Sequence, residues 1–121
     1  MILATINKSK QLLYLSFIGL VRVEEFARQR EEVLALLSEL APGFRLLTDL
    51  GRLDSLEEGC AAEIGKLMEL CDQNGVELVV RVIPNQTKDI GLGILSIFHY
   101  HHHPREVTCT DLIEAAELLS L

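Results

Sequence analysis

The chain has 121 residues, of which 49% are hydrophobic and 24% are charged, and its formal net charge is −7. This length suits one domain, and the hydrophobic content can fill a core, which indicates a folded protein rather than a disordered one. The negative charge argues against nucleic acid and anionic membrane surfaces as partners, because both attract clustered lysine and arginine. We predict no nucleic acid and no membrane partner.

The sequence shows neither a membrane span nor a secretory signal. No apolar run approaches the roughly 18 to 20 residues that cross a bilayer. The N-terminus lacks a basic region followed by a long apolar stretch and a small-residue cleavage site. We therefore expect a cytoplasmic protein.

Three cysteines are present, Cys60, Cys71 and Cys109. An odd, sparse set without C-x-x-C spacing predicts reduced thiols that behave as small buried hydrophobes. Cys60 and Cys71 fall on one predicted helix, where a separation of about 16 Å is too long for a disulfide.

The N-terminal third predicts a β-hairpin followed by an amphipathic helix. Residues 2–7 and 11–18 alternate between two faces, and Lys8-Ser9-Lys10 between them predicts the turn. From Val23 onward the apolar period becomes helical, and Pro42-Gly43 closes the helix. Its apolar face comprises Val23, Phe26, Val33, Leu37 and Leu40.

The middle of the chain predicts a strand at 44–50, a turn through Gly51, and a helix from Glu57 to Asn74 that Asn74-Gly75 ends. The predicted buried stripe of this helix comprises Ile64, Leu67, Met68 and Cys71. The next strand, 76–83, is nearly all apolar apart from Glu77 and Arg81, which is typical of a central strand buried on both faces.

The last third predicts a helix at Thr87–His99, a short strand at Glu106–Cys109 and a final helix at Asp111–Leu119. Asp111 is the predicted N-cap of that helix, with Glu114 at the reciprocal capping position. Strands and helices thus alternate as β-β-α-β-α-β-α-β-α. This order predicts a single α/β domain over residues 1–121, with helices packed on a mostly parallel sheet.

In this element order the chain resembles a STAS domain, the fold of bacterial anti-sigma factor antagonists and of the related SpoIIAA-like proteins. The resemblance is sharpest where Leu46-Leu47-Thr48-Asp49-Leu50 leads to Asp54-Ser55, and it returns in the closing Asp111-Leu112-Ile113-Glu114-Ala115-Ala116. It implies a mostly parallel or mixed sheet of four to five strands with about four helices. It also implies a bacterial signalling protein whose partner is another protein, such as an anti-sigma factor or kinase.

In antagonists of this kind, a serine that follows an aspartate is phosphorylated by the partner kinase, and the phosphate blocks docking. By position that serine is Ser55, with Asp54 before it, although Leu56 and Glu57 stand where the family pattern has a second small hydroxyl residue and a glycine. The predicted partner-binding surface collects at the carboxyl ends of the strands. It comprises Asp54, Glu57, Glu58, Asn85 and Thr87.

Ser55 has a second interpretation as a helix cap. Ser55-Leu56-Glu57-Glu58 is an S-x-x-E capping box, in which Ser55 caps the helix and Glu58 reaches back to the serine backbone. Such a cap contributes roughly 1 kcal/mol. A cap serine can also be phosphorylated, so both interpretations stay open.

The histidines at His99, His101, His102 and His103 form the other notable cluster. Imidazole is a common ligand of zinc, nickel and copper, and His99 and His103 have chelating spacing if helical. No glutamate completes an H-E-x-x-H pattern, and Pro104 disfavours helix at His103. We favour an exposed loop, with metal binding by His99, His101 and His103 as the weaker alternative, and we predict neither cofactor nor catalysis.

Two functions remain as hypotheses. The first is a non-catalytic regulatory module that binds a protein partner around Ser55. The alternative is a small apolar ligand held between helices and sheet, with Ser55 only a helix cap; its cavity would be lined by Ile94, Ile97, Phe98 and Met68. We also consider a homodimer, with the predicted third helix as its contact.

Overall fold

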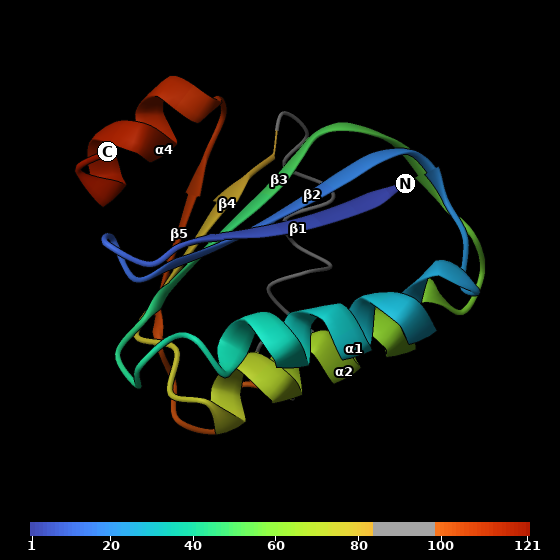
Figure 1. The fold of residues 1–121 in the computed structure, drawn as a ribbon. Coiled ribbons are helices and arrows are strands. Elements are labelled where there is room, and N and C mark those ends of the chain that lie inside the picture. The colour runs from blue at the N-terminus through green and yellow to red at the C-terminus, as the bar shows by residue number, and fades with distance from the viewer. Residues whose placement is uncertain (84–98) are drawn as a thin grey trace.

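The computed structural model describes residues 1–83 and 99–121. Its elements run along the chain in an order that Figure 1 follows by colour. They are β1 (Ile2–Asn7), β2 (Leu12–Val21), α1 (Glu25–Leu37), β3 (Arg45–Leu56), α2 (Cys60–Gln73), β4 (Leu78–Val82), β5 (Arg105–Cys109) and α4 (Leu112–Leu119).

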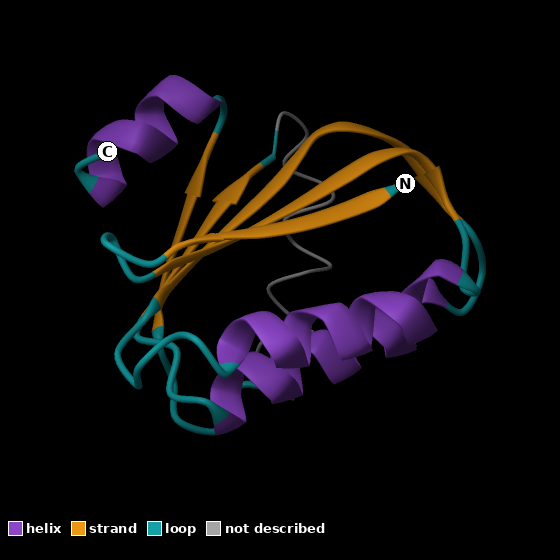
Figure 2. Cartoon of the chain, viewed as in Figure 1, coloured by secondary structure: helices purple, strands orange, loops and turns teal. Residues whose placement is uncertain are grey.

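One five-stranded sheet organises the domain, with its strands in the order β1-β2-β3-β4-β5. β1 pairs antiparallel with β2, and every later pair is parallel. α1 and α2 lie side by side on one face, whereas α4 packs on the other face against β4 and β5 (Figure 2). The predicted mixed α/β sheet is therefore confirmed, with three helices among the described residues rather than about four. None of these described helices has the length and apolar character to span a bilayer.

The sheet separates two apolar cores. The larger lies between the sheet and α1 and α2, and it contains the predicted stripe of α2. The smaller lies beneath α4. β4 contributes Val79 to the first core and Val80 and Val82 to the second, which explains why its sequence is apolar without alternation.

The predicted N-terminal hairpin and helix are confirmed, although their bounds differ: β2 runs on to Val21, and α1 begins at Glu25. The hairpin turn is held by the side chain of Asn7, which accepts hydrogen bonds from Ser9 and from the backbone of Lys10. α1 ends at Leu37, ahead of Pro42, because the next residues form tighter turns: the N–H of Leu40 bonds to the carbonyl of Leu37.

The prediction for Ser55 as a helix cap is wrong. β3 does not turn at Gly51 but continues to Leu56, because the end of β2 offers it a partner, with Leu20 opposite Ser55. α2 begins at Cys60 rather than Glu57, and its N-cap is Gly59, whose φ of 93° suits glycine. Tertiary pairing with β2 overrides the local capping signal.

The two predicted helix termini around β4 and β5 are confirmed. α2 ends at Gln73, and Gly75 follows with a φ of 86°, as the Asn74-Gly75 signal predicts. Asp111 caps α4 by accepting the N–H of Glu114 at 2.9 Å, while the Glu114 carboxylate accepts from the N–H of Thr110.

Several predictions lie outside the described residues. They concern Asn85, Thr87 and the helix predicted at Thr87–His99, of which only His99 is described. The predicted dimer contact falls on that same helix.

The corrected capping predicts a clear difference between two alanine variants. Asp111→Ala should lower the free energy of unfolding by about 1 kcal/mol, because it removes a true N-cap. Ser55→Ala should change it by less than about 0.5 kcal/mol, because its hydroxyl caps nothing. Urea unfolding measures both, and a loss of equal size in Ser55→Ala would contradict the assignment of α2.

Candidate functional site

The surface around Ser55 lies where β3 leads into α2. Asp54, Ser55 and Glu58 are exposed, so the hydroxyl is open to a modifying enzyme. Glu57 has a structural role: its carboxylate accepts the N–H of Val23 at 3.3 Å and lies 3.7 Å from the guanidinium of Arg22. The structure thus brings Ser55 together with three of the predicted surface residues, and one of these, Glu57, ties the β3–α2 connection to the β2–α1 connection.

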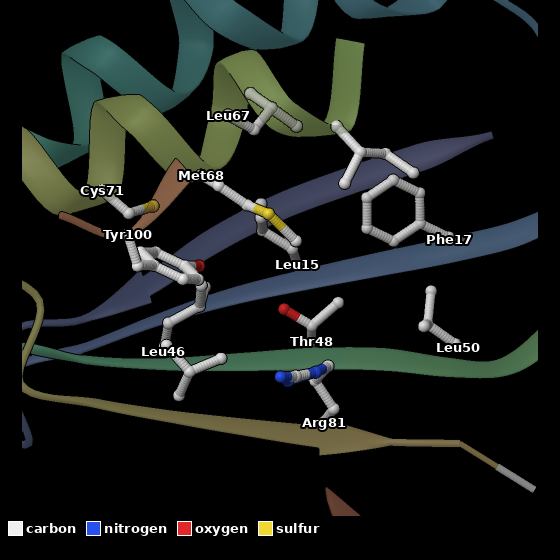
Figure 3. A pocket seen from close by; sticks show the side chains of 12 residues that line it. Leu15, Phe17, Leu46, Thr48, Leu50, Leu67, Met68, Cys71, Arg81 and Tyr100 are labelled. Atoms are coloured by element: carbon white, nitrogen blue, oxygen red, sulfur yellow. The ribbon is translucent and has the colours of Figure 1, made fainter. Parts of the chain in front are cut away.

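A cavity beneath α2 is the second candidate site. It lies between α2 and the middle of the sheet and measures about 40 Å³ as space open to the centre of a water molecule (Figure 3). Most of its lining is apolar, and Met68 is in it as the ligand-binding hypothesis predicts. Ile94, Ile97 and Phe98 fall outside the described residues.

Three polar side chains also line this cavity: Thr48 from β3, Arg81 from β4, and Tyr100. Thr48 and Arg81 are register neighbours in the sheet. Arg81 and Tyr100 are almost fully buried, at 5% and 2% exposure. Figure 3 shows the Tyr100 hydroxyl and the side chains of Thr48 and Arg81 directed toward the same space.

The charge of Arg81 is balanced within the sheet. Glu106 on the edge strand β5 accepts from both terminal guanidinium nitrogens, at 3.2 and 2.5 Å. The hydroxyls of Tyr100 and Thr48, unlike the Arg81 guanidinium, have no hydrogen-bond partner within residues 1–83 and 99–121. A buried tyrosine hydroxyl usually has a partner, so its freedom here is notable.

Burial controls the ionisation of two groups in the cavity wall. It raises the pKa of the Cys71 thiol to about 12, so this cysteine is neutral and unreactive at physiological pH. Burial likewise raises the pKa of Tyr100 well above its usual value. Tyr100 therefore keeps its proton and can donate it in a hydrogen bond.

Asp72, in the last turn of α2, fixes the backbone that follows Tyr100. Its buried carboxylate accepts the N–H groups of His101 and His102 at 3.0 and 3.1 Å, and the His102 ring lies 3.1 Å away. Burial alone would raise the pKa of Asp72, but these donors outweigh it and hold the pKa below its usual value. They also offset the unfavourable position of an anion at a helix C-terminus.

His99 adds a second attachment to α2. Its Nδ1 lies 3.0 Å from the carboxylate of Glu69, and its ring packs directly on Gly65, where a Cβ atom would come within 2.5 Å of Nε2. With Asp72 holding the following residues, Tyr100 is clamped into the cavity from both sides.

The described residues give no support to the predicted metal site at the histidines. Within the described residues, no group of three His, Cys, Asp or Glu side chains gathers in a way that could hold a metal ion. His99 contacts Glu69 instead, while His101 and His103 are exposed. All three cysteines are free and buried, as predicted.

Sequence reasoning missed the polar set of the cavity, although it left signals. Arg81 is the lone cation within the five residues of a strand predicted to be buried on both faces. Tyr100 is the one residue with a large apolar ring among the histidines. No short-range sequence pattern links Arg81 or Tyr100 to Asp72 or Thr48, which lie elsewhere in the chain.

Comparison with solved structures places the chain in a known fold. An uncharacterised DUF3478-family protein with a SpoIIAA-like fold from Shewanella loihica PV-4 matches with a TM-score of 0.75 and 18% identity, covering 98% of this chain and 93% of that chain. The unphosphorylated anti-sigma factor antagonist SpoIIAA matches with a TM-score of 0.67 and 7% identity, covering 99% and 98%.

The phosphorylated form of the Bacillus cell fate determinant SpoIIAA matches with a TM-score of 0.58 and 11% identity, covering 98% of this chain and 99% of that chain. A scan against protein-family models and a search of curated proteins gave no match. The chain therefore has a SpoIIAA-like fold.

The depressed pKa of Asp72 predicts how stability responds to acid. Because the folded-state pKa is lower than the unfolded value of about 3.9, the contribution of Asp72 is complete above that value and is lost as pH falls through the folded-state pKa. Asp72→Asn should lower the free energy of unfolding at pH 7 by about 2 kcal/mol and flatten this acid limb.

Urea unfolding at a series of pH values measures both effects. Asp54→Asn is the matched control, because Asp54 is exposed on β3. An Asp72→Asn curve parallel to that of the wild type down to pH 3 would contradict the role assigned to this carboxylate.

Proposed function

We propose that this protein is a non-catalytic binding protein that holds a small, mainly apolar ligand in the cavity beneath α2. The observation that carries the proposal is the cavity itself, an apolar space with a few converging polar groups between a helix and a sheet. Protein interiors are otherwise close-packed, and a pocket of this composition is typical of ligand sites.

The size of the cavity limits the ligand. About 40 Å³ of space for water centres is room for about three water molecules. Met68 lies in the wall, and its unbranched thioether side chain can adapt to a somewhat larger occupant. The ligand is therefore a molecule of a few carbon atoms or a short chain.

A cavity-filling variant tests the proposal. Native mass spectrometry of the gently purified protein should show a small co-purified adduct on the wild type, and Leu67→Phe should lose it, because Leu67 faces the cavity (Figure 3). Leu3→Phe is the matched control, since Leu3 is exposed on β1. Retention of the adduct in a folded Leu67→Phe protein would contradict this site.

The surface around Ser55 supports a second candidate, a regulatory module that binds a protein partner. Ser55 and its neighbours Asp54 and Glu58 are exposed beside α2, and a solved protein of the same fold is an anti-sigma factor antagonist known in phosphorylated and unphosphorylated forms. Phosphate on Ser55 would place bulk and negative charge in the middle of this surface and so disrupt docking to a partner that packs directly on the serine hydroxyl.

Partner capture from the native cytoplasm tests this candidate. An anti-sigma-like or kinase-like protein should bind the wild type and be lost with Ser55→Asp. Ser9→Asp is the matched control, because exposed Ser9 lies in the β1–β2 turn at the opposite end of the sheet. Identical partners for both variants, with no phosphate on Ser55, would rule the switch out.

A further inference from the structure

The cavity contains more hydrogen-bonding capacity than its walls use. Tyr100 is 2% exposed, and its hydroxyl lines the cavity with no hydrogen bond to any described residue. The Thr48 hydroxyl, on the opposite wall, likewise has no hydrogen bond to a described residue, and Thr48 is half-buried. A purely apolar occupant would leave both hydroxyls unsatisfied, which is unfavourable for buried polar groups.

Arg81 is the third polar group of the cavity, and it bears on the charge of the headgroup that the two hydroxyls would bind. The Arg81 guanidinium is a donor only and is always charged, whereas a hydroxyl can donate or accept. Arg81 lies next to Thr48 in register and 5% exposed in the same wall. Burial is the main cause that raises the pKa of Tyr100; among the neighbouring groups Arg81 lowers this pKa, whereas Cys71, Glu106 and Asp72 raise it.

We infer that the ligand is a short-chain carboxylic acid. Its carboxylate accepts hydrogen bonds from the hydroxyls of Tyr100 and Thr48 beside Arg81, and its short alkyl chain lies among the apolar side chains under α2. This assignment rests on the proposed ligand-binding function and specifies its ligand class.

Each part of the cavity matches one part of such an acid. An anion beside a guanidinium and two hydroxyl donors forms charge-assisted hydrogen bonds, which are stronger than neutral ones. Glu106 is already paired with Arg81, so the new hydrogen bonds to the acid come from the hydroxyls. The alkyl chain contacts Leu15, Leu67 and Met68 and removes apolar surface from water.

Three probes of similar size test the headgroup: butanoate, butanamide and 1-butanol, each titrated into the protein and followed by NMR chemical shifts. We expect butanoate to bind at least about tenfold more tightly than 1-butanol, with butanamide between them. Shifts should centre on the Met68 methyl group and on Tyr100.

Two conservative variants test the assigned donors. Tyr100→Phe should weaken butanoate about ten- to a hundredfold and 1-butanol much less, because only the charged headgroup forms the stronger bond. Thr48→Val should act in the same direction. Both should fold, since neither hydroxyl bonds to a described residue. Tyr14→Phe is the matched control: its hydroxyl bonds to Asp49 at 3.2 Å, and Tyr14 packs against the other core.

The outcomes separate the two claims. Equal affinity for butanoate and 1-butanol, unchanged by Tyr100→Phe, would overturn the carboxylate assignment and leave the apolar-ligand function standing. No binding by any of the three probes would overturn both. Butanoate shifts that map to exposed lysine and arginine side chains rather than the cavity would also overturn the assignment.

Discussion

The carboxylate of Asp72 is the constraint on which the candidate site depends. It is buried at the end of α2, where the helix dipole disfavours an anion, and it is stabilised there by two backbone N–H groups and the imidazole of His102. These bonds fix the chain that leads from Tyr100 into β5. On the other side of Tyr100, the ring of His99 packs against the backbone at Gly65. The Tyr100 ring is held between His99 and the residues bound by Asp72, and it points into the cavity.

The two cores of the domain differ in a way that points to function. The core beneath α4 is built from apolar side chains, among them Leu47, Val80 and Leu119, and the buried Asp49 beside it is hydrogen-bonded to Tyr14. The core beneath α2 contains a space, and an arginine, a threonine and a tyrosine border it. Filling that space with larger aliphatic residues would give a better-packed core, so the polar set is explained more simply by an occupant than by stability.

Sequence patterns predicted the fold where local signals and tertiary contacts agree. The hairpin, the apolar run of β4 and the Asp111 cap follow from residues close together in the chain. Sequence patterns gave the wrong prediction at Ser55, where a local capping box competes with pairing of β3 to β2 and the pairing prevails. The polar set of the cavity was beyond reach of these patterns, because it joins three separate segments and because Asp72 and His101, which position Tyr100, are 29 residues apart. The visible signals in the sequence were Arg81, a cation in an apolar strand, and Tyr100, an aromatic ring among histidines.

A crystal structure of the protein grown with butanoate tests the central claim most directly, namely that the space under α2 is a binding site for a short acid. The account predicts ligand density in the cavity, with a carboxylate oxygen within about 3 Å of the Tyr100 hydroxyl oxygen and the alkyl chain against Met68. A cavity that stays without ligand density at saturating butanoate, or butanoate bound only on the surface, would contradict it.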